Sequence, residues 1–449
     1  MENIAKVWRS STAFLLYAFS FLILITSCSN ELDEALQPAN NGTLQFVVSD
    51  FPMFGEGIQT RAIGTQDEGK TAWENGDQII VTLTSQKYGE QAAALTYDGS
   101  SWSTEASLSY LENETPSVSV IYAPCYEVTE EGTMQLRSGM QPGMTEYLSG
   151  DYEMENGIMT ITFEGAIRTY SRLRIAGLAN QTLTVTTTDF TPAGVNNSSP
   201  ESGEVPQAEG SVTYTLTTDN NGNAFLYGVF AEDATVIVKQ GTVTLTDYTF
   251  KQDTEANTSY ALDATPVIDG TLGGKTEATA AEVETLVQQL KDYVDNGITT
   301  IIVPGTEYAM YKSNLGTIPA FAEALYLLTD LNEDSPYCGT IDLILPDATE
   351  IIDFSFDSAD ALKSITLPKV TTVGDGAFYG CYYLQTITFG SVVTAINHNT
   401  KAEFHWVGKK VEGCDLVLNR EQVNAEEDYQ PNIETSTWWN TEWKSITLK

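Results

Sequence analysis

The chain has 449 residues, of which 22 are Lys or Arg and 61 are Asp or Glu, so its formal net charge at neutral pH is −39. A hydrophobic fraction of 42% is ample for folded cores, so the acidity belongs to the surface of a globular protein. So large a negative charge repels nucleic acids and anionic lipids, which argues against nucleic-acid binding. His398 and His405 are the two histidines, too few for most zinc sites and most histidine-based catalysis.

The N-terminus has the pattern of an export signal. A short basic head with Lys6 and Arg9 precedes an apolar block over residues 13–25, which is too short to span a bilayer. The block ends at Leu-Ile-Thr-Ser-Cys, whose cysteine is Cys28. This segment resembles a bacterial lipoprotein signal, which implies that residues 1–27 are removed and that Cys28 carries the acyl chains of a membrane anchor. The alternative is a cleaved secretory signal followed by an incidental cysteine.

An acidic tether is expected over residues 28–42. Residues 29–34 read Ser-Asn-Glu-Leu-Asp-Glu, and this stretch resembles the surface-export tag of lipoproteins from the Bacteroidota. The resemblance implies a protein held at the cell surface, on the outer membrane, by its lipid anchor alone. The alternative is a solvated linker with no export role.

From residue 43 to residue 268 the sequence has the period-2 alternation of short β-strands. Apolar residues alternate with polar ones in runs such as 79–83 and 212–216, and Asn, Gly and Asp turns separate the runs. Strands with this spacing predict antiparallel β-sandwiches. The length accommodates two of them, over residues 43–165 and 166–268.

One turn in this region has the look of half a calcium loop. Residues 219–223 read Asp-Asn-Asn-Gly-Asn, but Phe230 stands where an EF-hand loop needs its final Glu. A hairpin turn is therefore the better interpretation.

A series of short motifs runs through the same region. They are Thr60-Arg61-Ala62, the run Trp-Glu-Asn-Gly-Asp-Gln-Ile over residues 73–79, a hairpin from Tyr97 to Trp102, and a strand pair through Thr160–Phe163. Their order and spacing resemble the fimbrillin-like, or Mfa-like, surface proteins of the Bacteroidota. In resembling pilins a protease cuts after such an arginine and frees a groove that the next subunit's strand fills. The resemblance implies that Arg61 and Ala62 form a candidate processing site, with fimbrial subunits as partners.

An α/β segment is expected over residues 269–340. Thr279 to Glu282 is a capping box, and the apolar residues from Val283 to Val294 share one helical face. A buried strand is expected over Thr300–Val303, and a second helix should open at Pro319. We interpret the segment as a cap for the domain that follows.

A 22-residue repeat begins the last part of the chain, residues 341–449. Residues 340–361 align with residues 362–383, and a third copy starts at Leu384. The pentapeptide Lys-Ser-Ile-Thr-Leu of the second copy recurs over residues 444–448, so the chain should end on a strand of the same kind. One strand and one turn cannot bury their own apolar side, so the copies must stack as a solenoid.

The second copy of the repeat has a recognisable signature. Its Ala-Phe-x-x-Cys-x-x-Leu pattern consists of Ala377, Phe378, Cys381 and Leu384. This pattern resembles the BspA-type leucine-rich repeats. Neighbouring copies are degraded, so with so few repeats the α/β segment and the Trp-rich tail should serve as caps.

The outward residues of the repeat strands form a hydroxyl-rich ladder. Its central members are Ser364, Thr366, Thr386 and Thr388. Thr suits strands, so a plain solvated face is one interpretation. Solenoids also bind partners on such sheets, which makes these residues the candidate ligand surface.

Two further groups of side chains have structural and functional interpretations. Trp438, Trp439 and Trp443 could stack on sugars, but we favour a cap over the last repeat. Besides Cys28 there are four cysteines, which we expect to be buried free thiols rather than disulfides: Cys125, Cys338, Cys381 and Cys414. A catalytic pair of Cys381 with either histidine lacks any supporting motif.

The sequence as a whole predicts a mainly β protein: two antiparallel fimbrillin-like β-sandwiches followed by a short α/β-capped leucine-rich-repeat solenoid. We expect a non-enzymatic adhesion or ligand-binding lipoprotein without cofactor or metal, whose stalk presents a repeat head to a protein or glycan. The alternative is a fimbrial tip or anchor subunit, assembled by strand exchange after cleavage at Arg61. A second alternative is an envelope glycan-binding protein.

Overall fold

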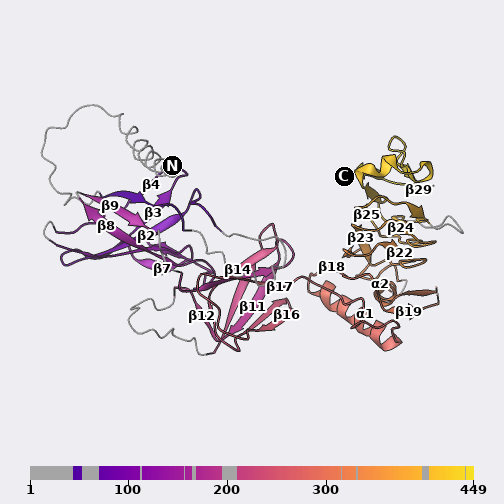
Figure 1. The fold of residues 1–449 in the computed structure, drawn as a ribbon, viewed down its shortest axis with the longest axis horizontal. Coiled ribbons are helices and arrows are strands. Elements are labelled where there is room, and N and C mark those ends of the chain that lie inside the picture. Colours follow the sequence, from indigo (N-terminus) through magenta and orange to yellow (C-terminus); the bar gives the residue numbers. More distant parts are fainter. Residues whose placement is uncertain are drawn as a thin grey trace, which may run out of the picture.

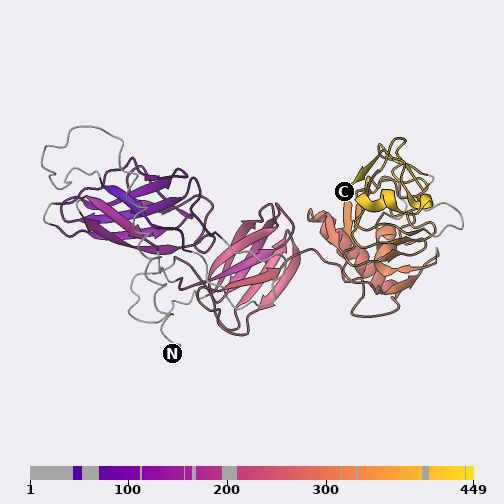
Figure 2. The ribbon, with the colours of Figure 1, turned by 45° about the horizontal axis from the view of Figure 1, so that its top comes forward.

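Three bodies follow one another along an elongated molecule, in chain order (Figure 1), and a second view shows the same row (Figure 2). The computed structural model describes residues 44–52, 70–111, 114–155, 157–163, 168–194, 210–314, 316–329, 332–396, 404–439 and 441–449. The predicted signal and tether with Cys28, and the candidate processing site at Arg61 and Ala62, lie outside these residues. Within them, no helix has the length and apolar character needed to cross a membrane.

The first body is one seven-stranded sheet that folds over on itself, in the order β1-β9-β8-β5-β2-β3-β4. Its strands are β1 (Gln45–Val48), β2 (Gln78–Ser85), β3 (Gly89–Tyr97), β4 (Trp102–Ser103), β5 (Ser117–Tyr122), β8 (Leu148–Glu155) and β9 (Ile158–Thr162). Strand β8 links the two layers, because its first residues pair with β5 and its later residues pair with β9. The main core, with Ile79, Val81 and Phe163, lies between the layers.

A hairpin covers the other face of this sheet. It consists of β6 (Tyr126–Val128) and β7 (Met134–Leu136). Beneath it lies a second small cluster that includes Ile80 and Ile121. Alternate side chains of the central strands therefore enter the two clusters, and both faces of the sheet are buried in its middle.

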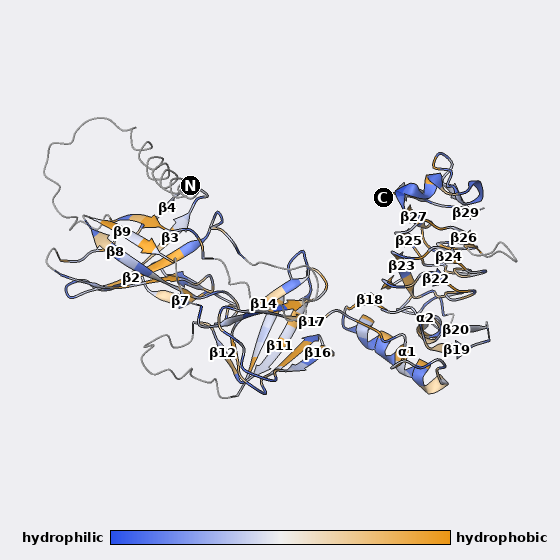
Figure 3. Cartoon of the chain, viewed as in Figure 1, coloured by the Kyte–Doolittle hydropathy of each residue, from blue (hydrophilic) through white to orange (hydrophobic). Residues whose placement is uncertain are grey.

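The second body is a sandwich of two four-stranded sheets, in the orders β12-β14-β10-β17 and β13-β11-β15-β16. Its strands are β10 (Ser171–Ala176), β11 (Thr182–Thr188), β12 (Phe190–Pro192), β13 (Ser211–Thr217), β14 (Asn223–Phe230), β15 (Thr235–Gln240), β16 (Val243–Thr249) and β17 (Ser259–Asp263). Hydrophobic and hydrophilic residues alternate along many of these strands (Figure 3). The inward set, which includes Val185, Leu226 and Val238, forms the core.

Two strand pairings depart from the antiparallel arrangement that the sequence predicted. β1 pairs in parallel with β9, and β17 pairs in parallel with β10. Each of these strands is far along the chain from its partner, so no tight turn dictates its direction.

The turn at Asp219–Asn223 also differs from the predicted hairpin, since it joins strands β13 and β14 of opposite sheets. The side chain of Asp219 accepts hydrogen bonds from the backbone N–H groups of Asn221 and Asn223, and so holds the turn. The polar groups of the apparent half calcium loop therefore form hydrogen bonds with one another, as they do in an Asx turn.

The third body opens with an α/β unit that confirms the predicted helices. Its elements are α1 (Ala280–Asp295), β18 (Thr300–Ile302), β19 (Met310–Lys312), β20 (Thr317–Pro319) and α2 (Ala320–Thr329). The capping box is formed, because the Thr279 side chain accepts from the Glu282 backbone and the Glu282 side chain accepts from the Thr279 backbone. α1 buries Val283, Leu286 and Leu290 against the rest of this body.

The repeats stack as a parallel solenoid. One sheet has the order β18-β21-β23-β25-β27-β30, and a second has the order β22-β24-β26. The added strands are β21 (Ile341–Ile344), β22 (Glu350–Ile351), β23 (Leu362–Leu367), β24 (Thr372–Val373), β25 (Thr386–Phe389), β26 (Ala395–Ile396), β27 (Asp415–Leu418) and β30 (Ser445–Leu448). The predicted register is confirmed, since Leu343 pairs with Ile365, which pairs with Ile387. Strand β27 was not predicted, because the spacing between strands lengthens after β25.

A column of aromatic rings runs through the solenoid and ends under the C-terminal tail. The rings of Phe356, Phe378 and Phe404 stack with centroids 5.6 Å apart at each step. The ring centroid of Trp443 lies 5.2 Å from that of Phe404, and the Trp438 residue is only 1% exposed. These two tryptophans therefore cap the column, as the sequence suggested, and much of the ribbon at this end of the solenoid consists of hydrophilic residues (Figure 3).

The tail that carries these tryptophans consists of short elements. They are the 3₁₀ helices η1 (Arg420–Asn424) and η2 (Glu427–Tyr429) and the strands β28 (Thr437–Trp438) and β29 (Thr441–Glu442). The indole N–H of Trp438 donates to the Tyr429 carbonyl at 2.9 Å, and the ring of Trp439 stacks on that of Tyr429. The buried indole thus has its polar group satisfied.

The second and third bodies meet at the C-terminal end of α1. The Asn296 side chain accepts from the backbone N–H of Thr242 at 2.7 Å and from its hydroxyl at 3.1 Å. Val243 and Leu245 of β16 also contact the core of the third body. The sandwich and the solenoid are thus joined by a contact as well as by the chain.

If Trp438 closes the solenoid, replacing it by Ala should strongly destabilise the third body. Truncation of a buried aromatic residue costs about 3–5 kcal/mol of unfolding free energy. Urea denaturation followed by tryptophan fluorescence measures this loss. The matched control is Trp406→Ala, at a position that is 39% exposed and whose ring contacts those of Tyr379 and Tyr382, where we expect a smaller loss of about 1–2 kcal/mol. Equal effects of the two changes would show that the tail is not a cap.

Candidate functional site

The outward side chains of the six-stranded sheet form two columns, which we call the ladder. The first column consists of Thr300, Asp342, Ser364, Thr386, Asp415 and Ser445. The second column consists of Ile302, Ile344, Thr366, Thr388, Val417 and Thr447. Between the columns point buried residues such as Ile365 and Ile387, so ladder side chains can change without opening a core cavity.

The four residues predicted as a ligand surface lie together in the middle of the ladder. Ser364 pairs with Thr386 and Thr366 pairs with Thr388, on the adjacent strands β23 and β25. All four side chains are half-buried. The structure therefore brings the predicted residues side by side, and their role in binding stays a prediction.

Two carboxylates organise the first column: Asp342, which the repeat alignment places beside Ser364, and Asp415, which the sequence did not single out. The Ser364 hydroxyl donates to Asp342 Oδ1 at 2.6 Å, and Lys363 Nζ lies 3.3 Å from Asp342 Oδ2. One end of the sheet repeats this arrangement: the Ser445 hydroxyl donates to Asp415 Oδ1 at 2.7 Å, and Lys444 Nζ lies 3.8 Å from Asp415 Oδ2. The ladder thus contains two like Asp-Ser-Lys clusters.

The recurrence of Lys-Ser-Ile-Thr-Leu was the available signal for these clusters. That pentapeptide supplies the Lys and the Ser of both, and each Asp comes from the neighbouring strand: the 22-residue alignment already places Asp342 beside Ser364, whereas only the strand order reveals Asp415 beside Ser445. The clusters are three strands apart, a distance of about 14 Å at the usual strand spacing. A partner that contacts both must therefore extend across the strands.

The clusters add little to the stability of the sheet, so they can serve binding. The side chains of Lys363 and Asp342 are 45% and 26% exposed, and ion pairs this exposed contribute about 0–1 kcal/mol. The charged groups can therefore leave their ion-pair partners and bind a ligand with little loss of folding free energy. The face offers charged groups, hydroxyl donors and acceptors, and apolar side chains at Ile344 and Val417.

Burial determines the chemical character of the cysteines among the described residues. Cys125, Cys338, Cys381 and Cys414 are free. Burial raises the pKa of Cys381 well above its usual value, and its thiol donates to the Phe356 carbonyl at 2.9 Å. Burial also raises the pKa of Cys125 and of Cys414. His398 lies outside the described residues, and His405 stacks on Tyr379.

Metal-ligating side chains do not gather in the described part of the chain. No group of three or more His, Cys, Asp or Glu side chains there is placed to hold a metal ion. The polar contacts of the ladder are hydrogen bonds and ion pairs between protein groups.

Comparison with known proteins identifies the repeats. Residues 337–403 match the family model of the BspA type leucine-rich repeat region. This match confirms the repeat type that Ala377, Phe378, Cys381 and Leu384 suggested. No curated protein sequence matches the chain.

Two solved structures match parts of the chain. A candidate cell adhesion protein from Bacteroides fragilis NCTC 9343 is 14% identical and covers 50% of this chain and 92% of its own, with a TM-score of 0.26. A shaft pilin, SpaA of Lactobacillus rhamnosus GG, is 13% identical and covers 43% of this chain and 93% of its own, with a TM-score of 0.16. Both TM-scores are low, and neither likeness assigns a function to this chain. The expected likeness of the sandwiches to fimbrillin-like proteins stays a prediction.

The burial of the thiols predicts their order of reaction. In the folded protein without its signal and anchor, iodoacetamide should label Cys338 first, because its side chain is half-buried whereas the other three are buried. In guanidinium chloride all four should react. Mass spectrometry of proteolytic peptides measures both patterns. Labelling of Cys381 as fast as that of Cys338 in the folded protein would contradict the packing described.

Proposed function

We propose that the protein is a non-enzymatic, surface-displayed lipoprotein that binds a protein or glycan through the ladder of its repeat domain. The observation that carries the proposal is a rigid sheet face with two like Asp-Ser-Lys clusters, on the body farthest from the first sandwich (Figure 1). The two sandwiches then act as a stalk and the solenoid acts as the head.

The physical character of the ladder favours binding of a macromolecule. Its inner strands β21, β23, β25 and β27 are each fixed by parallel pairing on both sides, so little backbone entropy is lost there when a partner binds. Short hydroxyl side chains such as Thr366 and Thr388 hydrogen-bond at low entropic cost. The two clusters lie about 14 Å apart, which suits a partner larger than a single small molecule.

The lipid anchor completes the proposal. The lipoprotein-like pattern that ends at Cys28 supports acylation, and the acidic residues after it support export to the outer face of the outer membrane. The first described strand begins at Gln45, so a short tether would join the anchor to the first sandwich. The head then points away from the membrane.

A fimbrial tip or anchor subunit is the second candidate, and the position of β1 favours it. This strand precedes Arg61 and lies at the edge of its sheet, paired only with β9 among the described strands. A cut after Arg61 would release β1 and leave the edge of β9 open for another strand. Against a shaft role, the C-terminal strand β30 is part of the solenoid sheet and so is not free to be donated.

The envelope glycan-binding alternative loses part of its support. It depended on the three tryptophans of the tail as stacking platforms for sugars. Trp438 and Trp443 are 1% and 5% exposed, and Trp439 is half-buried with its ring stacked on that of Tyr429.

Replacing Cys28 by Ala should remove the anchor and release or mislocalise the protein, because no acyl chain can then be attached. Cell fractionation and protease treatment of whole cells measure this, and the intact mass of the unaltered mature protein provides a further readout. Acyl groups retained on Cys28 support the anchored adhesin, whereas a new N-terminus at Ala62 supports the fimbrial alternative. Membrane attachment that survives the substitution would contradict both the anchor and its site.

Changing Thr366 and Thr388 together to Lys should abolish most adherence while leaving the fold intact, because both side chains point outward from the sheet. Surface substitutions usually cost about 0.5 kcal/mol or less, so the melting temperature should move by a few degrees at most. Adherence is measured to hits from an array of host proteins and glycans. The control pair is Thr349→Lys with Thr394→Lys, which are exposed positions outside the ladder. Adherence that falls equally in both pairs, or in neither, would rule out the ladder.

A further inference from the structure

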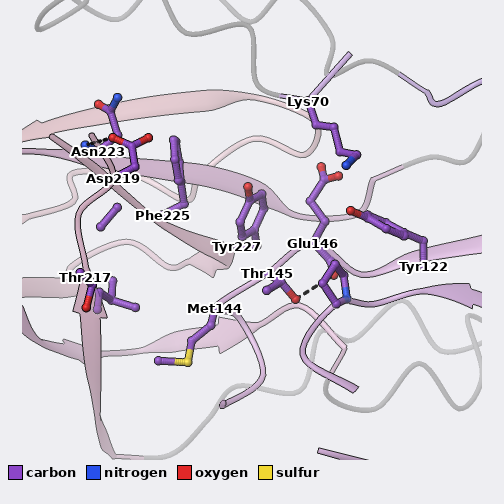
Figure 4. Close-up of a pocket in the computed structure, with 13 residues that line it drawn as sticks. Lys70, Tyr122, Met144, Thr145, Glu146, Thr217, Asp219, Asn223, Phe225 and Tyr227 are labelled. Carbon is purple, nitrogen blue, oxygen red and sulfur yellow. Dashed lines mark hydrogen bonds between the residues drawn. The ribbon is translucent and has the colours of Figure 1, made fainter. Parts of the chain in front are cut away.

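A pocket of about 360 Å³ lies at the junction of the two sandwiches (Figure 4), and no residue of the repeat domain lines it. The first sandwich supplies Lys70, Tyr122, Pro124 and the segment 144–146, and the second supplies Leu216, Thr217, Asp219, the segment 223–225 and Tyr227. Its volume is in the range of small-molecule sites. A ligand bound there would touch both sandwiches.

Glu146 is the unusual residue of this pocket. It is only 7% exposed, and its Oε1 accepts from Nε of the buried Arg168 at 2.9 Å. Its Oε2 has no hydrogen-bond partner among the described residues. Figure 4 shows the carboxylate directed toward Lys70 within the pocket. Buried carboxylate oxygens are rarely left without a donor, so this atom marks a place where a ligand can donate.

Lys70 places a donor at the same end of the pocket. Its ammonium lies 2.7 Å from Asp77 Oδ2 and 5.8 Å from the centre of the Tyr122 ring. The Tyr122 hydroxyl in turn donates to Asp77 Oδ1 at 3.3 Å. The flexible Lys70 side chain can move slightly to admit a ligand beside Glu146. This end of the pocket therefore combines an acceptor with a donor.

Aromatic rings line the middle of the pocket. Phe225 and Tyr227, on the outward face of β14, have centroids 6.4 Å apart with 35° between their planes. Beyond them lie the hydroxyl of Thr217 and the side chain of Asn223 (Figure 4). The pocket thus has an aromatic wall between two polar ends.

We propose that this junction pocket binds a neutral saccharide of one or two rings. Neighbouring hydroxyls of the sugar would donate to Glu146 Oε2 and accept from Lys70, while a C–H face would lie against Phe225 and Tyr227. An amine would face both Lys70 and Arg168, and an anion would face both Glu146 and Asp77, so the charges of the pocket disfavour either. A neutral polyol satisfies the acceptor and the donor together.

The binding test uses the whole chain without its signal and anchor. Glucose, galactose, mannose and N-acetylglucosamine are the neutral probes, and spermidine and N-acetylneuraminate are the charged ones. We expect saturable binding of at least one neutral sugar by saturation-transfer NMR, with a melting temperature raised by about 3 °C at ten times the dissociation constant. No neutral sugar bound, or only a charged probe bound, would overturn the proposal.

Two variants locate the site. Thr217→Trp should fill the pocket from its exposed rim and weaken binding at least tenfold without touching the Glu146 to Arg168 pair. Its matched control is Thr215→Trp, two residues earlier on the same exposed face of β13 but outside the pocket, where binding should be unchanged. Equal binding by both Trp variants would place the sugar elsewhere.

Glu146→Gln provides the chemical test, provided that circular dichroism shows a folded protein. It keeps the shape but removes the charge of the acceptor, so binding should also fall about tenfold. Unchanged binding by this folded variant would remove Glu146 from the site. None of these changes touches the ladder, so their outcome is independent of adherence through the repeat domain.

Discussion

The third body depends on one constraint, which is that a single strand-and-turn repeat cannot bury its own apolar side. The strands β21, β23 and β25 therefore stack in register, and the rings of Phe356, Phe378 and Phe404 form a continuous column inside them. A stack has two open ends, and both are covered. The α/β unit contributes β18 and two helices at one end, and Trp438 and Trp443 close the other.

This constraint also produces the surface that we propose for binding. Parallel stacking repeats each outward position on the next strand, so one small group of side chains becomes a column. That is how Ser364 meets Asp342 and how Ser445 meets Asp415. Cations are scarce in this chain, at 22 against 61 acids, and both proposed sites place a lysine against an aspartate. The net negative charge argues against nucleic acids as partners, and the local mixed-charge sites suit neutral or weakly charged partners.

The local features of the fold were predictable from the sequence. The 22-residue period predicted which strands pair, and the Thr279 to Glu282 capping box predicted the start of α1, because both signals lie within a few residues of the structure they specify. Strand β27 was missed because its spacing breaks the period. The parallel pairings of β1 and β17 were missed because long-range strand direction leaves no local pattern. Asp415 was missed together with β27, and the pocket around Glu146 could not be foreseen because its residues come from distant segments of the chain.

The most direct test of the central claim, that the repeat domain is the binding head, is whole-cell adherence after domain deletion. One strain displays the protein without residues 270–449, and the other displays it without residues 44–264, each behind the native tether. We expect adherence to be lost when the repeat domain is deleted and to be retained when the sandwiches are deleted. Adherence that persists after deletion of the repeat domain and disappears after deletion of the sandwiches would contradict the claim and make the sandwiches the adhesin.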